Sequence, residues 1–296
     1  MELLRLLENI RFPFLDSLIG IVTRLGEETV AVVVICVILW FVNKRVAYMI
    51  GVAFFLSGIT VQGAKICFRV DRPWIIDTSL NPVPSATSHA TGYSFPSGHT
   101  QAAASLFGSL GVAIRRRPIK TACILIPFLV AFSRMYLGVH TLLDVTVSLG
   151  ISFAFILLTQ KLLRDDSVNK KRDIILSVFM LLYTVAVIVI AAILFASGRI
   201  EERYLSDCLK ASGAGIGFSV GMFIERNYIK FSVAAKSKFM QATKFAFGFL
   251  GVIVIQEGIK LIAGTGLIID AFRYFLMIMW AIVFFPIIIK RFFAVP

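Results

Sequence analysis

Residues 173–198 read DIILSVFMLLYTVAVIVIAAILFASG, and this stretch decides which class of fold the chain adopts. Its one charged side chain, Asp173, stands at the first position, and apolar residues fill most of the rest. A helix needs about 20 apolar residues to cross the hydrocarbon core of a bilayer. Helices and closed barrels are the structures that satisfy their own backbone hydrogen bonds in lipid. The stretch therefore predicts a transmembrane helix.

Comparable apolar stretches recur on both sides of this one. The chain is 58% hydrophobic and its mean hydropathy is +0.87, far from the roughly half-apolar composition of soluble domains. We therefore predict an all-α fold, a polytopic transmembrane helix bundle of about nine spans plus an N-terminal interfacial helix. The expected spans cover residues 29–43, 47–67, 98–114, 119–137, 141–163, 173–198, 205–225, 245–263 and 267–289.

The first 28 residues differ from a secretory signal peptide. Charged side chains from Glu2 to Arg11 interrupt the apolar character, and no long apolar run with a small-residue cleavage site follows. Apolar and polar residues then interleave, which favours a helix lying in the bilayer interface. We expect three regions: the interfacial helix over residues 1–28, a catalytic core over 29–165, and a C-terminal bundle of about four spans over 166–296.

The formal net charge of +13 is concentrated in short clusters between the apolar stretches. Lys and Arg are retained in cytoplasmic loops, so such clusters indicate which loops face the cytoplasm. With the N-terminus outside, Lys44-Arg45 and Arg115–Arg117 fall in cytoplasmic loops, and the connection 68–97 faces away from the cytoplasm. The sequence shows no extended basic surface suited to nucleic acid, which we exclude as a partner.

Further patterns mark the C-terminal half. Glycines every four residues in the expected span 205–225 favour close packing of helices in lipid. Acidic and basic residues three apart in the last two spans favour ion pairs within a helix, or else the wall of a substrate cavity. A bridge between Cys67 and Cys208 is also possible near the outer face. The glycines are Gly213, Gly217 and Gly221, and the pairs are Glu257–Lys260 and Asp270–Arg273.

Three polar clusters stand where the expected spans meet the outer face. The first ends the second span, the second begins the third span, and the third joins the fourth span to the fifth. Alternate loops share one side of the membrane, so all three clusters are expected on the same face. They are Lys65 with Arg72-Pro73, then Pro96-Ser97-Gly98-His99, then Ser133-Arg134 with His140 and Asp144.

The clusters combine cations with the start of a helix. Lys65, Arg72 and Arg134 supply three positive charges, and phosphoryl transfer needs fixed cations and amide donors around the transferred group. Ser97 and Gly98 open a helix, whose first N–H groups lack internal partners and favour an anion. The residues therefore predict a site that binds a phosphate group.

Two histidines and a carboxylate complete the chemistry. His140 and Asp144 are four residues apart, which places them on one face of a helix. A carboxylate on one ring nitrogen fixes the tautomer and leaves the other nitrogen as a nucleophile. Histidine titrates near neutral pH, so His99 suits protonation of the leaving oxygen and then deprotonation of water. These roles require no metal ion and no cofactor if the cations neutralise the phosphate.

The three clusters resemble the signature of the type 2 phosphatidic acid phosphatase family, which is related to glucose-6-phosphatase and the vanadium haloperoxidases. All three parts match in order and without departure, over roughly residues 50–150. The resemblance implies a metal-independent membrane phosphatase. It implies phosphate binding by Lys65, Arg72, Ser97, Gly98 and Arg134, with His99 as the acid and base, His140 as the nucleophile and Asp144 as its partner.

The expected function is hydrolysis of a lipid phosphate or diphosphate at the outer face of a bacterial inner membrane. Candidate substrates are a polyprenyl diphosphate, phosphatidic acid or phosphatidylglycerol phosphate, with Trp74, Tyr93 and Phe95 as candidates to line the entry. The alternatives are glucose-6-phosphatase-like hydrolysis of a soluble sugar phosphate, and phosphotransfer to a lipid acceptor. The alternative of another class is a transporter or channel, which the paired intramembrane charges allow. His89 is expected to be a solvated loop residue.

Overall fold

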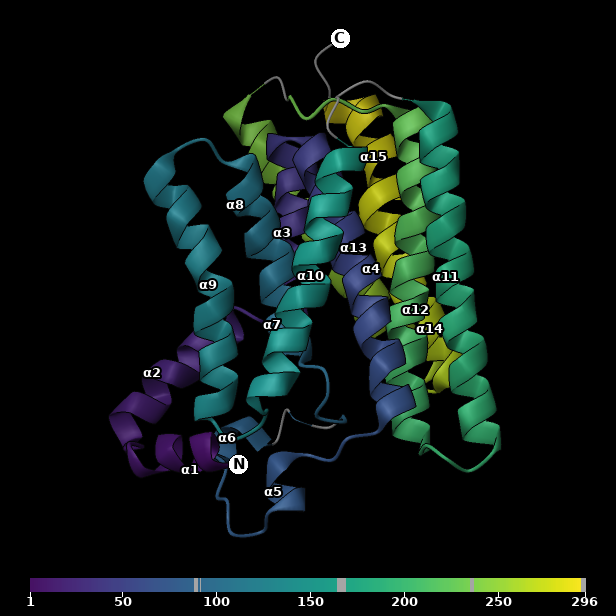
Figure 1. The fold of residues 1–296 in the computed structure, drawn as a ribbon. Coiled ribbons are helices and arrows are strands. Elements are labelled where there is room, and N and C mark those ends of the chain that lie inside the picture. Colours follow the sequence, from purple (N-terminus) through teal and green to yellow (C-terminus); the bar gives the residue numbers. More distant parts are fainter. Residues whose placement is uncertain (88–89, 91, 164–168, 235–236, 294–296) are drawn as a thin grey trace. The chain divides into compact units, whose positions relative to one another are not determined.

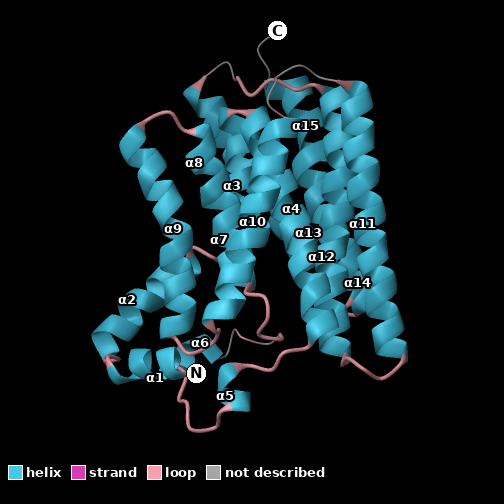
Figure 2. Ribbon diagram, in the orientation of Figure 1, coloured by secondary structure: helices cyan, strands magenta, loops and turns pink. Residues whose placement is uncertain are grey.

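The computed structural model describes residues 1–87, 90, 92–163, 169–234 and 237–293. Most of these residues are helical, and none of the described residues forms a strand (Figure 2). The prediction of an all-α membrane fold is confirmed. Five short segments of the described chain are π-helical and continue or interrupt the α-helices.

The chain divides into two compact units. Unit 1 comprises Met1–Ile35 and Val52–Leu162, and unit 2 comprises Cys36–Gly51 and Leu163–Pro296. Helix α4, Lys44–Phe68, begins in unit 2 and ends in unit 1. The division into an interfacial helix, a catalytic core and a C-terminal bundle stays a prediction.

Unit 1 is built from short N-terminal helices, long helices and the connections between them (Figure 1). In addition to the end of α4, its elements are α1 Glu2–Asn9, α2 Pro13–Arg24, most of α3 Glu28–Val37, α5 Pro73–Ile76, α6 Pro84–Thr87, α7 Gly98–Ala103, η2 Ala104–Gly108, α8 Ser109–Ala113, α9 Arg117–Tyr136 and α10 Leu142–Leu162.

Unit 2 contains the long C-terminal helices. In addition to the start of α4, its elements are η1 Ile38–Val42, α11 Lys170–Ala196, α12 Glu202–Ile224, η3 Glu225–Ile229, α13 Lys238–Ala263, α14 Leu267–Met279, η4 Trp280–Phe284, α15 Phe285–Ile288 and η5 Ile289–Phe293.

The number of membrane spans differs from the sequence prediction. All nine expected ranges are largely helical, but among the described residues six helices are long and apolar enough to cross a membrane. A seventh results if α2 and the α3–η1 segment, bent by 47°, form one span. The prediction of nine spans is therefore not confirmed. The segment 98–113 is shorter than the roughly 20 residues that a span requires.

The N-terminal region forms two helices instead of one interfacial helix. A break at Ile10–Phe12 separates α1 from α2, and Pro13 stands in the first turn of α2, where proline needs no hydrogen-bond partner. Helix α1 buries Leu4 and Leu7, and both helices pack against α9. These contacts, visible at the lower end of α9 in Figure 1, attach the N-terminus to unit 1.

Within unit 2 the glycine stripe lies between α12 and α14. A methyl group on Gly213 would lie 2.1 Å from the carbonyl oxygen of Ala271, and one on Gly217 would lie 2.8 Å from that of Phe275. The interpretation of the stripe as a close helix contact is confirmed. The expected ion pairs are also present, with 3.0 Å between Lys260 and Glu257 and 2.8 Å between Arg273 and Asp270. Cys67 is an exposed free thiol, which does not support the bridge to Cys208.

Candidate active site

The site lies in unit 1, where α4, α9 and α10 meet the connections at one end of the helices. Arg72 follows α4, directly before the proline that begins α5, and is 6% exposed. Its Nε donates to the carbonyl oxygen of Gly92 at 2.7 Å. Its Nη1 lies 3.0 Å from the carbonyl oxygen of Val139 and 2.9 Å from Nε2 of His140. Arg72 thus connects three chain segments at the predicted nucleophile.

His140 is placed by the way in which α9 ends. The amide of Val139 donates to the carbonyl of Arg134 at 3.1 Å, and that of Gly138 donates to Met135 at 2.9 Å. This is the Schellman pattern, in which the residue after the helix adopts a left-handed conformation that favours glycine. Gly138 has φ +77°, as the pattern requires. The chain therefore turns sharply and brings His140 back over the helix end.

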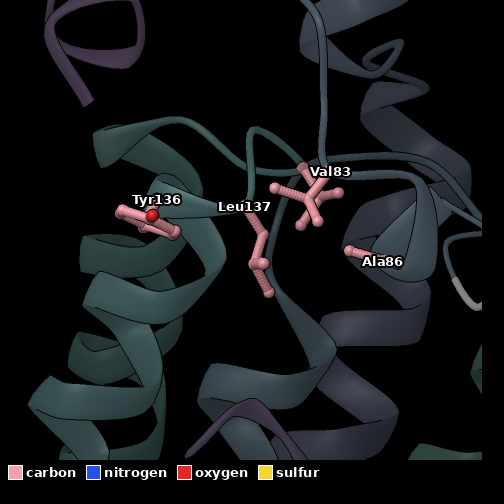
Figure 3. Close-up of a cluster of buried hydrophobic side chains, with 5 residues drawn as sticks. Val83, Ala86, Tyr136 and Leu137 are labelled. Carbon is pink, nitrogen blue, oxygen red and sulfur yellow. The ribbon is translucent and has the colours of Figure 1, made fainter. Parts of the chain in front are cut away.

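A small apolar cluster holds this turn from the other side. Val83 and Ala86, next to and within α6, pack with Tyr136, Leu137 and Val139, all at or below 7% exposure (Figure 3). The amide of Val83 also donates to the carbonyl of Leu137 at 3.0 Å. Burying these side chains away from water stabilises the turn. The loop between α5 and α7 is thereby joined to the segment that carries His140.

Asp144 is fixed by a capping box at the start of α10. The amide of Thr141 donates to Asp144 Oδ2 at 2.7 Å, and the amide of Asp144 lies 3.3 Å from Thr141 Oγ1. Such reciprocal bonds satisfy amides that lack partners in the first turn of a helix. The same Oδ2 atom accepts from Ser94 Oγ at 2.6 Å and lies 3.4 Å from Nδ1 of His140.

The pairing of His140 with Asp144 was expected from their spacing on one helix. Helix α10 begins at Leu142, so His140 lies before it, and the helical argument for this pair was wrong. The capping box, together with the turn at Gly138, brings the two side chains together instead. Both side chains are 2% exposed.

The neighbours of His140 decide which ring nitrogen carries the proton. A guanidinium can only donate, so the nitrogen that faces Arg72, Nε2, must accept. The proton of a neutral ring therefore lies on Nδ1, toward the carboxylate of Asp144. The Nε2 lone pair points into the group of cations.

Burial lowers the pKa of His140 well below its usual value of 6.5. The positive charges of Arg72, Arg134 and Lys65, and then that of His99, lower this pKa further. Burial disfavours the charged imidazolium, and nearby cations act in the same direction. These four side chains act on one imidazole, which shows that all three sequence clusters converge in space. Both effects therefore favour the neutral form of His140.

The start of α7 contributes the second cluster. Ser97 is the N-cap residue, and its Oγ accepts from Thr100 Oγ1 at 3.0 Å and lies 3.4 Å from the Thr100 amide. Its own amide donates to the carbonyl of Asp144 at 3.2 Å, which ties α7 to α10. A methyl group on Gly98 would lie 3.6 Å from Lys65 Nζ. The ammonium group of Lys65 therefore lies close to the backbone that precedes His99.

Arg134 approaches from α9 and is 2% exposed. Its Nη1 donates to Thr23 Oγ1, on α2, at 2.8 Å. Its Nε has no hydrogen-bond partner among the residues that the structure describes. A buried guanidinium with an unused donor is suited to an anion that enters the site.

All eight predicted site residues are therefore in one region of unit 1. Sequence reasoning missed Ser94, which binds Asp144, and Thr23, which binds Arg134. Ser94 stands two residues before the Pro96–His99 motif, but a single serine does not indicate its partner. Thr23 is far from Arg134 in the sequence. His89 lies outside the described residues. Within the described part of the chain, no three His, Cys, Asp or Glu side chains are grouped as metal ligands.

The fold is that of a helical membrane protein, and its candidate site brings histidines, cations and a carboxylate together. The chain belongs to the PAP2 superfamily of phosphatases. The sequence model of the PAP2 superfamily matches residues 45–167, and that of the transmembrane extension of PAP2 superfamily phosphatases matches residues 209–294. The family resemblance predicted from the three motifs is confirmed.

One solved structure is similar to the chain, that of LpxE from Aquifex aeolicus. The two chains are 29% identical, and the match covers 54% of this chain and 93% of that one, with a TM-score of 0.48. Among curated proteins, none matches the chain.

Proposed function

We propose that the protein hydrolyses a lipid phosphate or diphosphate through a phosphohistidine intermediate on His140. The observation that carries this proposal is the setting of His140, whose Nε2 lies 2.9 Å from Arg72 Nη1 while Nδ1 faces Asp144. The carboxylate side fixes the tautomer, and the cationic side is where a phosphate group binds. A histidine with only a structural role would not need a cation at one ring nitrogen and a carboxylate at the other.

In the first step, a phosphate oxygen takes the Arg72 donor that now contacts His140 Nε2. The released Nε2 lone pair attacks phosphorus, and the bond between phosphorus and the leaving oxygen breaks. His99 gives its proton to that oxygen. Lys65, Arg72 and Arg134 stabilise the negative charge on the three equatorial oxygens, as phosphoryl transfer requires.

In the second step, water attacks the phosphorus of the phosphohistidine, and His99 takes a proton from that water. The bond between phosphorus and Nε2 breaks, and inorganic phosphate leaves together with the alcohol or lipid monophosphate formed earlier. Asp144, whose Oδ2 lies 3.4 Å from Nδ1, faces that side of the ring in both steps. Cations from side chains perform the neutralising role in this scheme, so we propose that the reaction is metal-independent.

Exposed apolar side chains flank the site and favour a lipid substrate. Ile75 and Ile76 follow Arg72 by a few residues and are 56% and 59% exposed. Leu142 and Leu143 follow His140 and are 53% and 63% exposed. Exposure of such apolar side chains to water is unfavourable, so contact with the acyl or prenyl chains of a lipid would stabilise them. A lipid can thus present its phosphate to the cations while its chains remain in the bilayer.

We propose that the site faces the periplasmic or extracellular side of a bacterial inner membrane. The clusters Lys44-Arg45 and Arg115–Arg117 lie in loops on the other side of the predicted topology, as cytoplasmic loops do. The sequence contains no Asn-x-Ser/Thr glycosylation site, which agrees with a bacterial setting.

A substrate panel tests the proposal. Purified protein is assayed for phosphate release from phosphatidic acid, phosphatidylglycerol phosphate, a polyprenyl diphosphate and a hexose phosphate, with and without a chelator. We expect release from at least one lipid and little from the hexose phosphate. Preference for the hexose phosphate would overturn the lipid assignment and favour the soluble-substrate alternative. Loss of activity with the chelator would overturn metal independence.

The nucleophile is tested separately. The His140→Ala variant should lose about 10³-fold or more of kcat, as removal of a nucleophile does in other hydrolases. Rapid quenching of the wild type with radiolabelled substrate should trap phosphate that is labile in acid and stable in alkali. The His99→Ala variant is the comparison, since it keeps the nucleophile. Full turnover by His140→Ala would show that another residue attacks.

A further inference from the structure

A cavity in unit 2 is lined mainly by the start of α4 and by the segment from Glu225 to Val233. Its volume is about 470 Å³, and its polar lining includes Lys44, Arg45, Arg226 and Lys230. None of these residues belongs to the site around His140, which is built from unit 1. Their loops are cytoplasmic in the predicted topology.

Among the described residues that line the cavity, Glu225 is the one carboxylate, and both of its oxygens already accept hydrogen bonds. Glu225 is 0% exposed, and its Oε1 accepts from Lys44 Nζ at 2.8 Å and from the Phe231 amide at 3.2 Å. Its Oε2 accepts from the Tyr48 hydroxyl. Because Glu225 and Lys44 neutralise each other, this carboxylate adds little repulsion toward an anion in the cavity.

Arg226 presents a guanidinium edge with an unused donor. It is 8% exposed, and its Nε donates to the fully buried Asp173 at 2.9 Å. Its Nη2 has no hydrogen-bond partner within the described part of the chain. A buried unpaired donor costs free energy, and guanidinium geometry matches two oxygens of a phosphate. Arg226 is one of the residues that line the cavity, so this unpaired donor lies close to it.

Two lysines add positive charge that no described carboxylate neutralises. Lys230 lines the cavity, and Lys244 stands behind it, fully buried in α13. Lys244 Nζ donates to the carbonyls of Trp40 and Val233, each at 3.0 Å, and Val233 itself lines the cavity. Neither lysine forms an ion pair with an Asp or Glu among the described residues. Carbonyls orient an ammonium group but do not balance its charge.

We propose that this cavity binds a phosphate group, as part of a phospholipid headgroup or as a free phosphate. After the pairs Lys44–Glu225 and Arg226–Asp173 are set aside, Lys230 and Lys244 leave an excess of positive charge. Arg226 Nη2 supplies a directed donor, and the volume exceeds that of one phosphate. Unit 2 thereby carries an anion site of its own. This inference does not depend on the proposed function.

The test uses the full-length protein and two double variants. Lys230→Asn with Arg226→Lys removes the lysine charge and the guanidinium fork and keeps a cation beside Asp173. Asn tolerates the left-handed conformation of residue 230, where φ is +53°. The matched control is Lys171→Asn with Arg199→Lys, which makes the same chemical changes at exposed positions of unit 2.

Binding of phosphatidylglycerol is measured by native mass spectrometry, and binding of inorganic phosphate by calorimetry at matched ionic strength. The wild type and both variants keep the phosphate site at His140. The difference between the binding measured for the wild type and for the cavity variant therefore reports on the cavity alone. We expect the affinity of one site to fall about tenfold or more in the cavity variant, which corresponds to about 1.4 kcal/mol. The control variant should keep the affinity of the wild type at that site.

The two arms identify the source of the phosphate. A difference seen with phosphatidylglycerol alone assigns a lipid headgroup, and one seen with inorganic phosphate assigns a soluble ligand. Equal binding by the cavity variant and the control, with both probes, would overturn the proposal. If the double variant does not fold, Lys230→Asn alone is compared with Lys171→Asn by the same measurements. Because the assay reads binding, loss of phosphatase activity elsewhere would not affect its outcome.

Discussion

The Asp144 carboxylate shows how much a single atom contributes at the residue scale. Its Oδ2 atom accepts from Ser94 Oγ and the Thr141 amide, and it faces Nδ1 of His140. Three neighbours from two segments of the chain, Ser94 and His140-Thr141, thus share one oxygen. If the carboxylate rotated, it would lose one of the hydrogen bonds that it accepts. A hydrogen bond to a charged group contributes about 1.5–3 kcal/mol. Ser94 and Thr141 therefore help to orient His140 indirectly, because they fix the carboxylate that faces it.

The lowered pKa of His140 gives the first prediction. Burial and nearby cations disfavour the imidazolium, so the ring should stay neutral at pH 6.5, where a free histidine is half protonated. Below that pH the unfolded chain binds the proton first, so acid should also destabilise the fold. Histidine-labelled NMR checks this, because the chain has three histidines and His140→Ala assigns the signal.

The Arg72→Gln variant is the matched comparison for that titration. Among the neighbouring cations Arg72 lowers the pKa of His140 most, so its removal should raise that pKa toward 6.5. Protonation of the wild-type ring at or above pH 6.5 would contradict the cationic environment described here.

Ser94 gives the second prediction, as a positioning residue that acts through Asp144. Ser94→Ala removes the 2.6 Å hydrogen bond to Oδ2, so the carboxylate should hold His140 less firmly. We expect kcat to fall about 10-fold to 100-fold with KM little changed, from the energy of one charged hydrogen bond. Ser94→Thr should restore much of kcat. Equal fold-changes in Ser94→Ala and Ser94→Thr would point to a packing role instead.

At the scale of elements, caps and turns place the reacting groups more than the helices themselves do. The Schellman turn after α9 presents His140, the capping box of α10 presents Asp144, and the N-cap of α7 precedes His99. Each device satisfies backbone groups that a helix end leaves without partners. The site therefore lies where helices begin and end, which also explains why its residues occur in short motifs.

The turn between α2 and α3 gives a prediction at this scale. A methyl group on Gly26 would lie 2.5 Å from the carbonyl oxygen of His99 and 2.8 Å from Val130 Cγ1. Backbone atoms cannot yield as a flexible side chain can, so Gly26→Ala should displace the start of α7. We expect kcat to fall about tenfold or more, since displacements of about 1 Å are costly in catalysis.

Gly20→Ala is the control for that change. It lies in α2, and a methyl group there meets no described atom within 4 Å. Activity and thermal unfolding of both variants in detergent provide the measurement. Similar activity in Gly26→Ala and wild type would show that α7 does not depend on this contact.

At the scale of the whole molecule, the chain forms two compact units that α4 links. Unit 1 holds the residues of the candidate active site, and the segment matched by the transmembrane extension, residues 209–294, falls within unit 2. In lipid, where apolar surfaces gain little from leaving the solvent, close contacts and polar partners decide which helices associate. The close contact of Gly213 with α14 is of the first kind, and the hydrogen bond that Arg134 donates to Thr23 is of the second.

The proposed orientation gives a prediction for the intact molecule. In a variant whose four cysteines are replaced, Ser79→Cys on the loop between α5 and α6 should react with an impermeant thiol reagent on spheroplasts. Arg116→Cys, between α8 and α9, should react after permeabilisation, because its basic loop is cytoplasmic. Both positions are exposed in the protein, so a difference in labelling would reflect the side of the membrane and not burial of the residue. The opposite labelling pattern would reverse the assignment of the catalytic face.

The three motifs were sufficient to predict the family and the phosphate chemistry, and the structure brings their residues together. Their success has a simple reason, since histidines and cations beside membrane helices are costly and are seldom there without a partner. The number of spans was predicted less well. Hydropathy alone does not distinguish a short helix buried by its neighbours, such as the segment 98–113, from a helix that crosses lipid.

The sequence by itself determined the helical membrane fold, the polar clusters and their chemistry, because apolar length and residue type are local properties. The tertiary structure alone decided that Ser94 and Thr141 orient Asp144, that Thr23 holds Arg134, and that a basic cavity forms in unit 2. These partners are distant in sequence or depend on how a helix ends. Only packing fixes which buried donor meets which acceptor, since any of several serines or threonines could satisfy the same requirement.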